Sequence, residues 1–341
     1  MLTIQAAPVP FNPDTATPAE RLAIGNLLAE SFAFTYPQDP PLIPEQEALS
    51  LGFVTPGERI EQFVVWADAI QARALAWGAL DYSLEQNLHL GFARVLVHPE
   101  ARRRGLGHRL ASLLQERARQ AGHTTLTCMT TDRAPAGAPF AQSFGMAKAI
   151  INRRSQLELS SVSEALLNAW LTRPDAEPYR LHLWSRLPEN HLARFAELTM
   201  VMNTAPRGEL EYDDWTITPE MLRAWEAQLE AEGETRWTAV IEDTRDGQLV
   251  GYSEVYWHPL RASIIGQGAT AVRPEARGQG LGKWLKAALL RQMVSACPGA
   301  RYVRTSNANE NAAMLGINVA LGFAPWAEMV EWQLKLEPAQ A

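Results

Sequence analysis

Two stretches of this chain combine closely spaced glycines with basic side chains, a combination suited to holding an anionic ligand. The clearer one is Arg277–Gly282, which reads Arg-Gly-Gln-Gly-Leu-Gly and is followed by Lys283. It lies between a β-branched run and a segment whose apolar residues recur at helical spacing. Glycines leave main-chain N–H groups uncovered, and a helix N-terminus carries partial positive charge. The stretch therefore favours a phosphorylated ligand.

Two better-known glycine motifs do not fit this stretch. A Rossmann fingerprint needs a third glycine where the chain has Leu285. A phosphate-binding loop of the NTPase kind needs a glycine and a Ser/Thr where the chain has Arg277 and Trp284. Dinucleotide and nucleoside triphosphate sites of these two kinds are therefore excluded.

The same arrangement occurs a second time. Val97–Gly107 aligns without a gap on Val272–Gly282, at an offset of 280 − 105 = 175 residues. The offset also places Gly91 on Gly266 and Leu110 on Leu285. Self-similarity at so long a period indicates a duplicated unit.

The pattern Arg/Gln-x-x-Gly-x-Gly/Ala resembles motif A of the GNAT N-acetyltransferase superfamily, in which the loop holds the pyrophosphate of acetyl-coenzyme A. The resemblance implies acetyl-CoA as co-substrate, bound through a loop in each half. In the second half the implied contacts are Val272, Arg277, Gly278, Gln279, Gly280, Leu281, Gly282 and Lys283. In the first half they are Val97, Arg102, Arg103, Arg104, Gly105, Leu106, Gly107 and His108.

A second GNAT signature is present in the second half alone. The run from Asn309 and Asn311 through Asn318 to Leu321-Gly322-Phe323 resembles it, and by resemblance the asparagines at the helix start contact the cofactor. Simple helix capping is the alternative for Asn309 and Asn311, because asparagine is a preferred N-cap. In the first half, Ala134 and Ala141 stand in place of Asn311 and Asn318. We therefore expect the second half to carry the chemistry and the first half to be degenerate or accessory.

GNAT enzymes, by resemblance, let an amine attack the bound thioester directly. A lysine-like amine is neutral in only about one part in 2,500 at pH 7, so its deprotonation costs about 4.6 kcal/mol. Protonating the leaving thiolate is easier, because its pKa lies only about 1.5 units above neutrality. The family's usual acid, a tyrosine, is replaced by Asn318, and its usual carboxylate position falls on Gly266. The costlier role, that of the base, is the one without an obvious residue.

Glu254 is the best substitute for the missing base. Strand alternation over 249–258 puts Tyr252, Glu254, Tyr256 and His258 on one face of the sheet. A mid-strand glutamate in a sheet covered on both sides is costly to bury without a purpose. A solvent-facing position for Glu254 is the open alternative, and Tyr256 is a weaker candidate, as a relay. The predicted catalytic set is thus Glu254, Tyr256 and Asn318.

Composition limits the remaining possibilities. A net charge of −7 argues against a nucleic-acid partner. The chain has no apolar run of membrane-spanning length and no signal-peptide pattern, so we expect no membrane association and a cytoplasmic location. Two cysteines without ligand spacing favour neither a metal site nor a disulfide framework. The expected partner is a small-molecule or peptide amine, and the expected assembly a monomer or homodimer.

The elements expected around these residues form two similar units. Strand-like runs and helical segments alternate in each half, which predicts the α/β class with an α+β mixed sheet. The resemblance implies that the two halves are GNAT-like acyl-CoA N-acyltransferase domains in tandem. The predicted segments are residues 1–160, a linker at 161–178, and residues 179–341. Thr17 and Glu20 form a predicted capping box at the first helix. The leading function is acetyl-CoA-dependent N-acetyltransferase; the alternative is a non-catalytic acyl-CoA-binding or sensing protein.

Overall fold

The computed structural model describes residues 7–68 and 70–337, and the chain forms two compact units. The first unit contains residues 7–150, 208–213 and 329–337, and the second contains 151–207 and 214–328. Each is a mixed sheet with helices on both faces, as the sequence predicts. Each unit is described by itself below.

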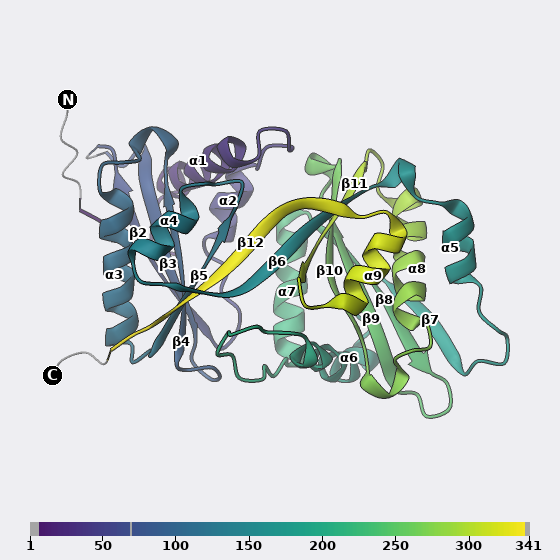
Figure 1. Cartoon of the computed structure of the whole chain (residues 1–341). Coiled ribbons are helices and arrows are strands. Elements are labelled where there is room, and N and C mark those ends of the chain that lie inside the picture. The colour runs from purple at the N-terminus through teal and green to yellow at the C-terminus, as the bar shows by residue number, and fades with distance from the viewer. Residues whose placement is uncertain (1–6, 69, 338–341) are drawn as a thin grey trace. The chain divides into compact units, whose positions relative to one another are not determined.

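In the first unit the strand order is β1-β2-β3-β4-β5-β12 (Figure 1). Only β4 and β5 pair in parallel among the described strands; the other neighbours are antiparallel. The strands are β1 (Val9–Phe11), β2 (Glu58–Trp66), β3 (Ala74–Ser83), β4 (Leu90–Val97), β5 (Thr125–Thr131) and most of β12 (Ala324–Lys335). The helices are α1 (Pro18–Thr35), α2 (Pro44–Ser50), α3 (Leu106–Gln120) and α4 (Gly137–Ser143), with the 3₁₀ turn η1 (Pro99–Ala101).

In the second unit the strand order is β6-β11-β10-β9-β8-β7, again with one parallel pair, β10 and β11, among the described strands. The strands are most of β6 (Ala147–Glu158), β7 (Tyr179–Trp184), β8 (Thr235–Asp243), β9 (Leu249–Trp257), β10 (Ile264–Val272) and β11 (Tyr302–Ala308). The helices are α5 (Glu164–Leu171), α6 (Leu192–Thr199), α7 (Pro219–Glu232), α8 (Leu281–Ala296) and α9 (Ala312–Leu321). Its 3₁₀ turns are η2 (Leu159–Ser161), η3 (Glu189–His191), η4 (Met200–Thr204), η5 (Pro259–Arg261) and η6 (Pro274–Ala276).

The two halves of the sequence exchange a strand. From β6, the stretch 152–158 pairs with β11, so it completes the sheet of the second unit and not that of the first. From β12, the stretch 329–335 pairs with β5 and completes the sheet of the first unit (yellow in Figure 1). The predicted boundaries at residues 160 and 179 do not anticipate this exchange, because a strand's alternating pattern does not name its partner strand.

A short excursion of the second half also belongs to the first unit. Gly208 is in a left-handed conformation (φ +55°), and the Glu209 amide donates to the Ala149 carbonyl. His89 contacts the carbonyl of Glu211 at 2.7 Å, and Lys335 forms an ion pair with the Glu211 carboxylate. The acidic side chain of Glu211 is thereby held on the first unit.

The long helices bury the same repeated positions. In α3 the buried leucines are Leu106, Leu110 and Leu114, and in α8 they are Leu281, Leu285 and Leu289. Each pair is separated by the 175 residues found in the sequence, so the duplication extends into the cores. The predicted capping box is also present: the Thr17 hydroxyl accepts from the Glu20 amide, and the Glu20 carboxylate accepts from the Thr17 amide.

Candidate functional site

The site begins where the parallel strands separate. In the second unit β10 and β11 are in register over Ile264–Gly266, and β10 then shifts register against β9 between Gln267 and Thr270. In the first unit β4 and β5 are in register over Leu90–Phe92. In both units the diverging strand leads directly to a glycine loop. A gap between strands whose main-chain edges are unpaired is a natural place for an extended ligand.

The glycine loops have the conformation that an anion site requires. Gly105 and Gly280 are the N-caps of α3 and α8, with φ of +78° and +76°, and neither cap carries a side-chain hydrogen bond. In the described part of the chain, no partner is recorded for the main-chain N–H groups of 103–108 and 278–283. The loops are largely exposed. These amides can therefore donate to a phosphate at the positive end of each helix.

The basic residues of the loops brace the main chain. The Arg277 Nε donates to the Val272 carbonyl at 3.0 Å, and Arg102 makes the equivalent bond to Val97 at 3.3 Å. Arg103 adopts a left-handed φ of +62°, where the second loop has Gly278. The two loops thus share one fold, and their amides are the groups left for a ligand.

The remaining predicted loop residues have identifiable neighbours. Gln279 accepts from the Tyr179 hydroxyl at 3.0 Å and, through its carbonyl, from Arg173 at 2.9 Å. Lys283 Nζ lies 5.5 Å from the Trp170 ring centre, and the His108 ring lies 4.9 Å from that of Phe144. Arg104 is exposed, and Gly107 and Gly282 are half-buried against a neighbouring helix. Their part in binding a cofactor stays a prediction.

Glu254 is buried within β9, so the solvent-facing alternative is wrong. Its residue is 9% exposed, on the same face as the buried Tyr252. The neighbouring Gly268 leaves room for the Tyr256 ring, because a Cβ there would lie 2.7 Å from it. The alternate residues Val255 and Trp257 face the other side, in the core that contains α8. The carboxylate therefore lies across the sheet from the glycine-loop helix.

Two groups contact the Glu254 carboxylate. The guanidinium of Arg236 in β8 approaches Oε1 at 3.6 Å, and the Tyr256 hydroxyl donates to Oε2 at 3.4 Å. Burial raises the pKa of Glu254, against the opposing effects of Arg236 and the Tyr256 bond. Burial, followed by the Glu254 charge, raises the pKa of Tyr256, so this phenol stays protonated at neutral pH. The site thus combines a buried carboxylate, whose pKa is raised, with a protonated phenol beside it.

Arg236 is a residue that the sequence analysis missed. Its side chain is 5% exposed and forms a second ion pair, with Glu226 of α7 at 2.7 Å. Glu226 in turn pairs with Arg223, which reaches Glu189. Strand alternation in β8 predicts that the Arg236 side chain is buried, by the same reasoning that predicts the position of Glu254. Because a buried guanidinium without a partner is strongly destabilising, Arg236 depends on its ion pairs with Glu226 and Glu254.

The predicted asparagines lie in the turn between β11 and α9, at the N-cap of α9 and within α9. Asn311 is the N-cap of α9 and accepts from the Met314 amide at 3.2 Å, so capping is its observed contact. Asn318 is 1% exposed and donates to Asn307 Oδ1 at 2.7 Å, while its own Oδ1 has no partner in the described chain. Asn309 is exposed, and its main-chain N–H donates to the Ile151 carbonyl. An amide cannot supply an acidic proton, so Asn318 cannot repeat the chemistry of a tyrosine.

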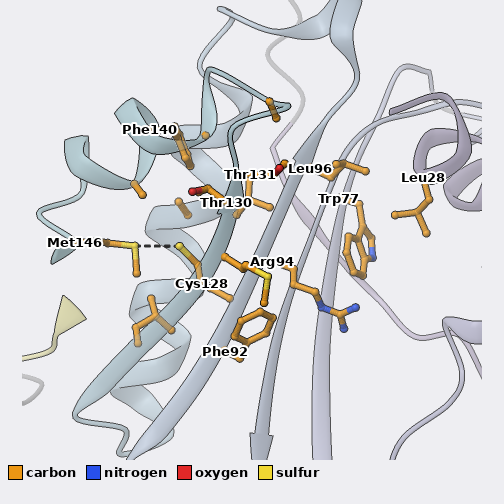
Figure 2. Close-up of a pocket in the computed structure, with 18 of the residues that line it drawn as sticks. Leu28, Trp77, Phe92, Arg94, Leu96, Cys128, Thr130, Thr131, Phe140 and Met146 are labelled. Carbon is orange, nitrogen blue, oxygen red and sulfur yellow. Dashed lines mark hydrogen bonds between the residues drawn. The ribbon is translucent and has the colours of Figure 1, made fainter. Parts of the chain in front are cut away.

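The first unit has no carboxylate at the position that aligns with Glu254. The 175-residue offset places Ala79 at the position of Glu254 and Asp81 at that of Tyr256. Both Asp81 oxygens accept from Arg94, at 2.7 and 2.9 Å. This unit instead contains a cavity of about 760 Å³ along β4 and β5 (Figure 2). The two units therefore differ at the point where the chemistry would take place.

The described residues contain neither a metal-binding cluster nor a membrane-spanning helix. Residues 7–68 and 70–337 contain no cluster of three His, Cys, Asp or Glu side chains placed to hold a metal ion. Over the same ranges, none of the helices combines the length and apolar character that a bilayer crossing requires.

Comparison with known proteins agrees with this geometry. The acetyltransferase (GNAT) family model matches twice, over residues 23–146 and 192–323. A mycothiol acetyltransferase of Kytococcus sedentarius is 27% identical over 282 residues, which are 80% of each chain. A tandem GNAT protein of the clavulanic acid biosynthesis pathway, solved without acetyl-CoA, has a TM-score of 0.79 at 25% identity, over 98% of this chain and 100% of its own.

A more distant structure shows the fold alone. A GCN5-related N-acetyltransferase of Sphaerobacter thermophilus is 15% identical, with a TM-score of 0.63 over 98% of this chain and 97% of its own. The paired glycine loops, the diverging parallel strands and the doubled family match lead to one conclusion: the chain belongs to the GNAT acetyltransferase family, as a tandem protein with two GNAT units.

Proposed function

We propose that the second unit transfers the acetyl group of acetyl-CoA directly to a primary amine of a small molecule or peptide. The observation that carries this proposal is the buried carboxylate of Glu254, next to the strand that leads to the glycine loop of α8. The unpartnered amides at 278–283 support a pyrophosphate contact there. The first unit, with Ala79 in place of Glu254, has an accessory role.

The reaction requires two proton movements. Glu254, directly or through water, takes the proton of the ammonium form, and the neutral amine then attacks the thioester carbonyl carbon. The tetrahedral intermediate collapses, the carbon–sulfur bond breaks, and the nitrogen gives its second proton to water, so that an amide and coenzyme A thiolate leave. Because the thiol pKa lies only about 1.5 units above neutrality, the thiolate leaves without an acid at Asn318 and is protonated afterwards by solvent.

Thiol release from acetyl-CoA across a panel of amines tests the proposal. The full-length protein should release coenzyme A with at least one amine, and Gly280→Trp should abolish turnover by covering the α8 amides. Gly122→Trp is the matched control, because Gly122 also has a positive φ (+86°) but lies outside both loops. Turnover that survives in Gly280→Trp would place the reaction elsewhere. Acetyl-CoA binding without turnover of any amine would favour a sensing protein.

A further inference from the structure

The cavity of the first unit passes through its sheet. Registered pairing of β4 and β5 ends at Phe92 opposite Thr127, and beyond that point the strands separate. Side chains from both faces line the space that results (Figure 2). Phe140 of α4 lies on one side, and Leu28 of α1 lies on the other. Ala111 of α3 also lines the cavity. A volume of about 760 Å³ is in the range of small-molecule sites.

The helix that follows the glycine loop of this unit, α3, lines the cavity through Ala111 and Gln115. Ala111 belongs to the second turn of α3, whose N-cap is Gly105. The amides of 103–108 have no recorded partner in the described chain. A ligand with a phosphate on these amides can therefore extend along α3 into the gap between the strands.

The other side is an apolar compartment. Its lining from α1, the segment after α2 and the strands is mainly Leu28, Leu51, Phe53, Ile60, Trp77 and Leu96. The polar groups among them are engaged within the protein. Gln62 donates to the Leu51 carbonyl and accepts from Trp77, while Arg94 is bound to Asp81. Thr35 and Ser50 donate to the carbonyls of Ser31 and Gln46, and Glu47 of α2 contributes a carboxylate to walls that are otherwise mainly apolar.

We propose that the first unit binds a coenzyme A thioester with a medium-length aliphatic acyl chain, and holds it without transferring it. The pyrophosphate lies on the α3 amides, and the acyl chain crosses the sheet into the compartment below α1. This inference rests on the proposed function for the use of acyl-CoA. Retention without transfer follows from Ala79, which replaces the buried carboxylate of the other unit. Each methylene that leaves water should tighten binding about fourfold.

Calorimetry on the full-length Gly280→Trp protein tests the proposal, because this variant removes the loop of the second unit. Octanoyl-CoA should bind at least about tenfold more tightly than acetyl-CoA. Leu28→Trp, which fills the compartment from α1, should abolish this preference and leave acetyl-CoA binding in place. Leu49→Trp is the matched control, since Leu49 is exposed on α2 and outside the cavity.

Three results would overturn the proposal: equal affinity for the two thioesters, a preference that survives in Leu28→Trp, or thiol release from octanoyl-CoA by the Gly280→Trp protein in the presence of amines. Circular dichroism and thermal melting establish that each variant is folded. Octanoyl-CoA binding in a wild-type protein that never acetylates an amine would contradict the proposed function alone. Acetylation without octanoyl-CoA preference would contradict this inference alone.

Discussion

If Glu254 is the general base, replacing this one carboxylate should slow acetyl transfer. Glu254→Gln keeps the size of the side chain and removes its basicity, so the rate of acetyl transfer should fall by roughly 10²–10⁴-fold. Glu189→Gln is the control, because Glu189 is an exposed carboxylate at the far end of the same chain of ion pairs. Steady-state thiol release measures both. A Glu254→Gln enzyme with the wild-type rate and pH profile would exclude Glu254 as the base.

Arg236 should determine where that base titrates. A base acts when deprotonated, so activity falls as pH decreases through the pKa of Glu254, which burial raises above 4.5. The positive charge of Arg236 opposes this rise. Arg236→Gln should therefore move the acid limb of kcat/KM to higher pH, whereas Arg236→Lys, which keeps the charge, should leave it near the wild-type position. An unmoved limb in folded Arg236→Gln would separate Arg236 from catalysis.

Lys286 is another buried basic side chain of the second unit, in addition to Arg236. It is 2% exposed in α8, with its Nζ 5.7 Å from the Phe323 ring centre, and burial lowers its pKa to about 7. The unfolded chain holds this proton up to about pH 10.4, so between these values the unfolded state binds more protons. Wild-type stability should consequently rise from pH 7 toward pH 10, an increase that disappears below pH 7, where both states are protonated.

Lys286→Met should be more stable than wild type at pH 7 and should lose this part of the pH dependence. Urea unfolding of both proteins at pH 6.5, 7.5 and 8.5 measures the difference, which should shrink as pH rises. A difference that is independent of pH would mean that Lys286 is charged in the folded protein at every pH tested.

At the scale of elements, local sequence signals predict the bounds of helices and strands, but they do not predict which elements contact one another. The bounds of α3, α7, β7 and β9 follow from apolar periodicity with glycine and threonine at the ends, because these signals act within a few residues. The burial of Glu254 follows from alternation within one strand. Its contact with Arg236 does not, since the register of β8 against β9 is set by the whole sheet. The loops of the candidate site were thus predictable, and the ion pairs around it were not.

Two glycines within helices, one closely packed and one with open space around it, test the contact between α1 and α2. Alanine normally stabilises a helix interior by up to about 1 kcal/mol relative to glycine. Gly25 of α1 is an exception, because a Cβ there would lie 2.1 Å from the Pro44 carbonyl at the start of α2. Gly25→Ala should destabilise the protein by roughly 1–3 kcal/mol. Gly316→Ala in α9, where a Cβ meets nothing within 4 Å, should stabilise it. Urea denaturation compares them; the same sign for both would contradict the close approach of α1 to α2.

At the scale of the whole molecule, the exchange of strands makes the first unit depend on both the N-terminal and the C-terminal part of the chain. The edge of β5 in the first unit is paired by 329–335, a stretch that includes the buried Trp332. The Trp332 indole donates to Thr130 at 2.8 Å. Without this strand β5 would present an unpaired edge beside an exposed core, a state that favours unfolding or aggregation.

A chain that ends at Glu328 should therefore lose the first unit although its deletion lies at the far end of the sequence. Hydrogen exchange should find peptides from β2 to β5 unprotected, and peptides from β8 to β10 protected, because β6 still pairs with β11 within 152–158. A chain that ends at Glu337 is the control and should exchange like the full-length protein. Native protection of β4 and β5 in the shorter chain would mean that the first unit forms its core without the 329–335 stretch of β12.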